Sequence, residues 1–263
     1  RSIKMTDTTS ANTGNTTNSA TIDGNMFLYK RPVLLNLEEH GKLGLQKRPN
    51  PFEFVKTVKA IPIVAAEFSS VQKHYPIVFS NLDNPAALAI VGLKEDRNLF
   101  VSEDGQWDPH SYVPSYIRRY PYALATGENN QAAVVIDTGA DGVTEHADFP
   151  FFDGQSVTKE TQDMIDFCQQ FALEATKTQN LCRRIKELGL LTPQTATQNT
   201  DDGSEPTVIA NYVSIDPEKL TDLSADEVKS LLNDGVMASI FSQAFSMENW
   251  TRLIARENLQ KAR

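Results

Sequence analysis

The spacing of the apolar residues changes about half-way along the chain. Between residues 26 and 137 they form short runs rich in β-branched, aromatic and alanine side chains, separated by polar turn signals such as 81–85 and 127–130. A spacing of about 8–12 residues between runs is typical of hairpins and meanders rather than of βαβ units. The pattern predicts strands within the ranges 33–37, 60–68, 75–79, 86–91, 99–101, 122–125 and 132–136.

From residue 158 onward the period becomes helical. Apolar and small residues recur at alternating steps of four and three, which places them on one face of a long helix. Thr158 is a suitable N-cap and Gly189 a suitable C′ residue, so we expect this helix to extend to Leu188. The residues of the stripe are Met164, Cys168, Phe171, Ala175, Thr178, Cys182 and Ile185.

The remaining C-terminal residues predict a β-hairpin followed by helices. A polar turn over 199–206 precedes the β-rich run 207–215. Ser224 and Glu227 have the spacing of a capping box, which predicts the start of a short helix. Two further helices are expected, over 236–245 and 248–261.

Together these elements predict an α+β protein. A largely antiparallel sheet in the N-terminal half would pack with the long helix and with the C-terminal hairpin plus helices. Because the apolar stripe needs a partner surface that the sheet can supply, we expect residues 26–263 to form a single domain. Residues 1–25 are rich in Thr, Asn and Ser, with few large apolar side chains to offset the entropy of ordering, so they are predicted to be a disordered polar tail.

Composition and charge narrow the class of protein. Of the 263 residues, 40% are hydrophobic and 22% charged, as in ordinary globular proteins. Lys and Arg number 25 against 34 Asp and Glu, a net charge of −9, which disfavours nucleic acid as a partner because phosphate binding needs a clustered basic face. No apolar run approaches the roughly 20 residues of a membrane span. The N-terminal residues lack the apolar stretch of a secretory signal, so we expect a cytoplasmic protein.

The two cysteines, Cys168 and Cys182, are too few for a disulfide framework. Both lie on the stripe of the long helix, where a rise of about 1.5 Å per residue separates them by about 21 Å. A disulfide requires Cα atoms within about 7 Å of each other, so these residues are predicted to be packed core thiols.

Asp137 opens the string Asp-Thr-Gly directly after a predicted strand, which resembles the signature of retroviral-type aspartic proteases. In those enzymes two aspartates share one proton and activate water. The context disfavours that chemistry, because a long helix follows and Val208-Ile209 precedes Ala210 where a glycine is expected. An Asx-type turn after a strand uses the same residues for structural reasons.

His146 and Asp148 match the first two ligands of a 2-His-1-carboxylate iron site. In the cupin-type oxygenases that carry this motif the second histidine comes later in the chain, but His146 is the last of the four histidines here. Asp137, His146 and Asp148 remain the candidate catalytic residues of an alternative, an enzyme acting on a peptide or a sugar as an aspartic-type hydrolase or a metal-dependent modifying enzyme. The chain has no G-x-S-x-G elbow, Walker A loop or G-x-G-x-x-G, and we expect no bound metal or cofactor.

The segment from Trp107 to Pro121 combines aromatic residues with two adjacent arginines. A guanidinium between aromatic rings can stack on them or bind a carboxylate with two hydrogen bonds. The segment is either a recognition surface for a carboxylate, phosphate or sugar, or a structural clamp between an arginine and a carboxylate such as Asp137 or Asp153. The candidate binding residues are Trp107, Tyr112, Tyr116, Arg118, Arg119 and Asp153.

This segment and several others, in order, resemble the bacterial SapC-like family, which is associated by name with surface-layer proteins. The strings that carry the resemblance are Phe27–Val33, Ile61–Phe68, Tyr75–Phe79, Asn98–Val101, Gly105–Trp107, Tyr112–Pro121, Ile136–Asp137, Phe152–Gly154 and Leu181–Leu190. The resemblance implies a non-catalytic binding or accessory protein, linked to surface-polymer or surface-layer biogenesis or to nutrient uptake. It implies a protein, peptide or glycan as partner and supplies no catalytic residues.

Overall fold

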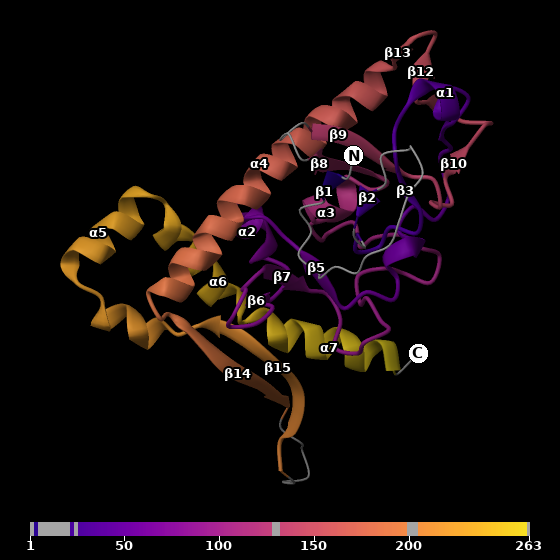
Figure 1. Ribbon diagram of the computed structural model, residues 1–263. Helices are drawn as coiled ribbons and strands as arrows, with labels where there is room; N and C mark the ends of the chain where they lie inside the picture. The colour runs from indigo at the N-terminus through magenta and orange to yellow at the C-terminus, as the bar shows by residue number, and fades with distance from the viewer. Residues whose placement is uncertain (1–2, 5–21, 24–25, 128–131, 199–204, 262–263) are drawn as a thin grey trace. The chain divides into compact units, whose positions relative to one another are not determined.

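The computed structural model describes residues 3–4, 22–23, 26–127, 132–198 and 205–261 (Figure 1). Helices and mainly antiparallel strands confirm the predicted α+β class. The chain divides into two compact units: unit 1 comprises residues 1–51 and 118–172, and unit 2 comprises 52–117 and 173–263. Most of the predicted N-terminal tail lies outside the described residues, and a single domain over 26–263 stays a prediction.

Unit 1 contains a five-stranded sheet in the order β2-β1-β8-β9-β3. In its central hairpin Tyr122 lies opposite Ile136, and Val33 lies opposite Ile136 from the other side. The strands of this sheet are β1 (Ile3–Lys4), β2 (Ile22–Asp23), β3 (Pro32–Leu34), β8 (Tyr122–Gly127) and β9 (Ala132–Asp137). Smaller elements are α1 (Leu37–His40), β4 (Gly44–Leu45), β10 (Val143–Thr144), β11 (Phe149–Pro150), β12 (Phe152–Asp153) and β13 (Ser156–Val157).

The predicted long helix is α4 (Lys159–Glu187), and its ends agree with the predicted ones to within one residue. The Thr158 hydroxyl accepts a hydrogen bond from the Thr161 amide, and Gly189 follows the helix at φ = 69°. In unit 1 the apolar stripe of the helix contributes Cys168 to a core with Tyr122, Ile136 and Phe151. The two cysteines are both buried and free, as expected for core thiols.

Unit 2 contains a second five-stranded sheet, in the order β14-β15-β6-β7-β5. The strands of the N-terminal half are therefore divided between two sheets, and the predicted C-terminal hairpin joins the second. The strands are β5 (Ala60–Pro62), β6 (Ile77–Phe79), β7 (Ala87–Ile90), β14 (Leu191–Gln198) and β15 (Thr207–Ile215). The helices are the 3₁₀ turns Glu53–Val55, Ala65–Glu67 and Pro217–Asp222, with α2 (Phe68–Val71), α3 (Ser115–Arg118, whose last residue belongs to unit 1), α5 (Ala225–Asn233), α6 (Val236–Ser246) and α7 (Asn249–Lys261).

Some predicted strands differ from the structure. The run 33–37 is a strand only as far as Leu34, and its last residue, Leu37, begins α1. The strand predicted over 60–68 ends at Pro62, because the Glu67 carboxylate accepts a hydrogen bond from the Val64 amide at 2.9 Å and closes a helical turn there. The run 99–101 contributes only an isolated bridge between Val101 and Trp107. The capping box of Ser224 and Glu227 at the start of α5 is confirmed.

Within the described residues, no helix combines the length and the apolar character that crossing a bilayer requires.

Gly44 provides a test of the packing in unit 1. A Cβ added there would overlap the Phe149 carbonyl oxygen and lie 2.5 Å from Pro150 Cα, and both of these are backbone atoms of β11. We expect Gly44→Ala to lower the free energy of unfolding by about 2 kcal/mol or more, measured by urea titration.

Gly142→Ala is the matched control for this test. The nearest atom to its added Cβ is the Gln46 carbonyl oxygen at 3.4 Å, an ordinary contact, and Gly142 is not among the glycines with positive φ. Its unfolding free energy should stay within about 1 kcal/mol of the original chain. Equal losses in the two variants would contradict the steric explanation.

Candidate functional site

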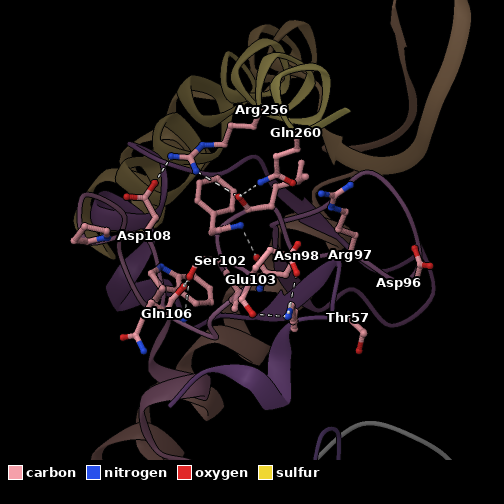
Figure 2. A pocket seen from close by; sticks show the side chains of 16 residues that line it. Thr57, Asp96, Arg97, Asn98, Ser102, Glu103, Gln106, Asp108, Arg256 and Gln260 are labelled. Atoms are coloured by element: carbon pink, nitrogen blue, oxygen red, sulfur yellow. Dashed lines mark hydrogen bonds and ion pairs between the residues drawn. The ribbon is translucent and has the colours of Figure 1, made fainter. Parts of the chain in front are cut away.

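Unit 2 contains an open pocket of about 760 Å³ (Figure 2). Its walls come from three separate parts of the chain: residues 56–57, the loop 96–109, and the last turns of α7. Figure 2 shows Arg256 and Gln260 reaching down from α7, with Asp108 facing Arg256. Ligand sites are usually concave and place polar groups beside an apolar lining, and this pocket combines aromatic, amide and charged side chains.

The pocket loop is held in shape by its own polar groups. Asn98 is buried, and its side-chain oxygen accepts a hydrogen bond from the Phe100 amide at 2.9 Å while its amide group donates to the Val55 carbonyl at 3.2 Å. The turn at 102–106 is closed by a hydrogen bond from the Ser102 amide to the Gln106 carbonyl at 2.8 Å, and its Gly105 has φ = 73°. Because these polar groups have hydrogen-bond partners, the loop keeps a fixed shape and forms one wall of the pocket.

Trp107, one of the predicted binding residues, forms part of the apolar wall. Its ring stacks with Phe100 at 6.5 Å between centroids and meets Phe52 and Tyr75 edge-on at 5.7 and 6.4 Å. Because only 6% of Trp107 is exposed, it contributes a small patch to the pocket rather than a protruding stacking platform.

Arg256 of α7 spans one side of the pocket. Its guanidinium lies 4.2 Å from the centroid of the Phe100 ring and forms an ion pair with Asp108. Burial alone would raise the pKa of Asp108. Hydrogen bonds from the His110 amide, the Arg256 guanidinium and the Ser111 hydroxyl outweigh that effect and lower the pKa below its usual value. The positive charge of Arg256 is therefore already neutralised by Asp108 within the pocket.

Arg97 differs from Arg256 in having no such partner. It lines the same pocket, its side chain is half-buried, and its guanidinium forms no hydrogen bond or ion pair with any residue that the structure describes. Gln260, on the opposing helix α7, uses one amide hydrogen for the Leu99 carbonyl at 3.3 Å. A half-buried guanidinium with free N–H groups can bind a carboxylate through two hydrogen bonds.

Tyr112 and Tyr116, also predicted to bind, have structural roles in unit 2. The Tyr112 hydroxyl donates to the Glu67 carboxylate at 2.9 Å, and that carboxylate also accepts the Ser115 amide and hydroxyl at 2.9 and 2.8 Å. Tyr116 is only 1% exposed. These contacts favour the structural explanation of this part of the motif.

Arg118, Arg119 and Asp153 belong to unit 1. Arg119 is buried, with its guanidinium 4.4 Å from the Phe171 ring centroid, whereas Arg118 is exposed and lies 5.2 Å from the Phe167 ring centroid. Asp153 is exposed in the β12–β13 hairpin. The arrangement favours a packing role for Arg119 and leaves Arg118 and Asp153 at the surface.

Asp137 is completely buried in unit 1, and four donors reach its two oxygens. Oδ1 accepts the amides of Arg31 and Gly139 at 2.7 and 2.9 Å, and Oδ2 accepts the Lys30 amide and the Tyr120 hydroxyl at 2.9 and 3.0 Å. This carboxylate closes a turn and ties it to the segment before β3, as an Asx-type turn requires.

His146 and Asp148 are exposed in unit 1. The Asp148 carboxylate accepts the Lys47 amide at 2.8 Å, and the His146 amide donates to the Thr144 hydroxyl at 3.3 Å. Among the described residues, no group of three or more His, Cys, Asp or Glu side chains is arranged to hold a metal ion.

The model of the SapC family matches residues 35–253, well over half of the chain. The chain belongs to the SapC family. No curated protein and no solved structure matches this SapC chain.

The sequence alone did not identify most of the residues that line the pocket of this SapC chain. Arg97, Asp108 and Arg256 carry no recognisable motif and are brought together only by the fold. One local signal was present, because Arg256 and Gln260 are four residues apart in a predicted helix and therefore share a face.

The four hydrogen bonds of Asp137 predict a large loss of stability on truncation. Asp137→Ala leaves three backbone amides without their acceptor and should lower the free energy of unfolding by about 3 kcal/mol or more. Asp153→Ala, at an exposed aspartate of the same unit, should stay within about 0.5 kcal/mol. Urea titration followed by circular dichroism measures both, and a loss below about 1 kcal/mol for Asp137→Ala would contradict the structural role.

The lowered pKa of Asp108 predicts a pH effect with a defined sign. A depressed folded-state pKa adds stability above the unfolded-state value, near about 3.9, which is lost as the pH falls through the folded-state value. The stability difference between the original chain and Asp108→Asn should therefore be largest above about pH 5 and shrink below about pH 4. Arg256→Gln should reduce the acid sensitivity in the same way, and a pH-independent difference would contradict the ion pair's role.

Proposed function

We propose that this SapC-family chain is a non-catalytic binding protein whose ligand occupies the pocket of unit 2. The observation that carries the proposal is the Arg97 guanidinium, which lines an open pocket and has no partner among the residues that the structure describes. A half-buried cation of this kind loses part of its hydration and is compensated when a ligand supplies an acceptor.

The lining supports a peptide or glycan segment with a single carboxylate as the ligand. Arg97 would bind the carboxylate, while the rest of the Gln260 amide group can meet a carbonyl or hydroxyl group. Asp96 and Glu103 also line the pocket, so a ligand with several negative charges would meet repulsion there. The small exposed parts of Trp107 and Phe100 supply a limited apolar wall.

Several other polar groups that line the pocket are already engaged by partners within the fold. Asp108 is committed to Arg256, and the Lys56 ammonium donates to the Glu103 carbonyl at 2.9 Å and lies 3.5 Å from the Glu53 carboxylate. The Ser102 hydroxyl forms hydrogen bonds within its own turn, to Gln106 and Asp104. Each of these groups already has a partner within the fold, which supports Arg97 as the group that meets a ligand.

The family resemblance suggests the setting in which such binding would act. A SapC-family protein that holds a peptide or glycan segment would serve as an accessory in surface-layer or surface-polymer biogenesis, or in nutrient uptake. Its partner in that setting would be a protein, a peptide or a glycan.

Calorimetric titration tests the pocket with defined probes. The probes are a short oligosaccharide of uronic acid, its neutral counterpart, and a tripeptide with a free or an amidated C-terminus. We expect binding of a probe that carries a carboxylate, with affinity at least about tenfold lower in Arg97→Ala, because a charge-assisted pair of hydrogen bonds is lost.

Arg118→Ala is the matched control, since Arg118 is an exposed arginine of the other unit that the sequence also nominates. Its affinity for the same probe should equal that of the original chain. Loss of binding in Arg118→Ala but not in Arg97→Ala would assign the site to the arginine-aromatic segment, and equal binding of the carboxylate and neutral probes would refute the proposed role of Arg97.

A further inference from the structure

Helix α6 carries apolar residues on its exposed side. Its eleven residues contain no charged side chain. Phe241 and Phe245 are 47% and 65% exposed, and their rings stack on each other at 6.2 Å between centroids. With the exposed Ala238 they form a stripe at i, i+3 and i+7, which we call the α6 stripe.

The opposite face of α6 is fixed to the sheet of unit 2. Val236, Met237 and Ile240 are buried there. The Gln243 side chain donates to the Ile77 carbonyl at 2.9 Å, and the Ser246 hydroxyl accepts from the Ile77 amide at 2.8 Å. Rotating the helix to bury the phenylalanines would break both hydrogen bonds.

An apolar face of a helix is normally packed against another part of the protein. Here one face is covered and held in register, while two adjacent phenylalanines of the other face remain exposed. Clustered exposed aromatic residues of this kind mark interaction surfaces, because covering them releases water and supplies large contact areas. The α6 stripe has the spacing that receives the apolar face of a second helix.

The charge of the chain segment that contains the stripe indicates the chemistry of that helix. Residues 216–248 contain seven Asp or Glu and two Lys, a net charge of 2 − 7 = −5, within a chain of net charge −9. The exposed acidic residues of this segment are Glu218, Asp222, Asp226, Asp234 and Glu248. Glu248 also follows the C-terminal end of α6, where the helix dipole adds negative potential.

We propose that the α6 stripe docks a basic amphipathic helix of a partner protein. Apolar residues of that helix would cover Phe241 and Phe245, and flanking Lys or Arg side chains would face the acidic residues of 216–248. A second copy of this chain fits less well, because the same acidic segments would face each other. This surface is made by other residues than the pocket and goes beyond the function proposed above.

Fluorescence anisotropy with a labelled peptide tests the proposal on the full chain. The probe is a helical peptide of about 18 residues with leucines on one face and lysines on the other, and the comparison peptide has glutamate in place of lysine. We expect the lysine peptide alone to bind, and its affinity to fall between roughly 0.05 M and 0.5 M salt.

Matched variants locate the binding. Phe241→Ser combined with Phe245→Ser should lower the affinity at least about tenfold, whereas Leu173→Ser combined with Leu259→Ser, at two other exposed apolar positions, should leave it unchanged. Asp226→Lys combined with Asp234→Lys should also weaken binding, and Glu145→Lys, at an exposed residue of unit 1, should not. The charge variants keep both phenylalanines, so they test the electrostatic part of the proposal separately.

Several outcomes would overturn the proposal. Equal binding of the lysine and glutamate peptides would show a non-selective apolar surface, and unchanged binding in both the phenylalanine and the acidic variants would place the peptide elsewhere. Sedimentation that shows a dimer dissolved by the phenylalanine variant would assign the stripe to a second copy. Binding to vesicles of anionic lipid that is lost in that variant would assign it to a membrane surface.

Discussion

A buried carboxylate must be surrounded by donors, and Asp137 in unit 1 and Glu67 in unit 2 meet that requirement. In unit 2 the Glu67 carboxylate joins the turn at Val64 to the amide and hydroxyl of Ser115, 48 residues later in the sequence. The loop that carries Trp107 and Asp108 ends just before this anchor. Glu67 therefore anchors the chain that follows the pocket loop, although it contributes no atom to the pocket lining.

The elements that the sequence predicts best are those whose ends and faces are determined by residues close to them in the chain. The ends of α4 follow from Thr158 and Gly189 and from an apolar stripe with helical spacing. The strand predicted over 60–68 is too long. β-propensity depends on residue type alone, whereas the strand is ended by a hydrogen bond from the Val64 amide to the Glu67 side chain. The pocket could not be predicted, because Arg97 and Arg256 are far apart in sequence. They line the same pocket only because α7 packs on the loop 96–109.

The most distinctive string of the chain makes packing contacts that its sequence alone does not reveal. Tyr112, Tyr116 and Arg119 suggested a recognition surface, yet Tyr112 binds Glu67 and the other two are buried. The Arg119 guanidinium lies 4.4 Å from the centroid of the Phe171 ring. This contact requires an aromatic residue at 171 and an arginine just before β8, so few other residues fit at these two positions. Membership of the SapC family rests on the whole span 35–253 and does not depend on a ligand role for this string.

The two buried cysteines have a consequence for the redox behaviour of the chain. Burial raises the pKa of the Cys168 thiol to about 11 and that of Cys182 to about 12. Near neutral pH only about one thiol in 10⁴ or fewer is then a thiolate, the form that reacts with oxidants and disulfides. The fold needs no disulfide and presents no reactive thiol, so it should persist equally in reducing and in oxidising surroundings.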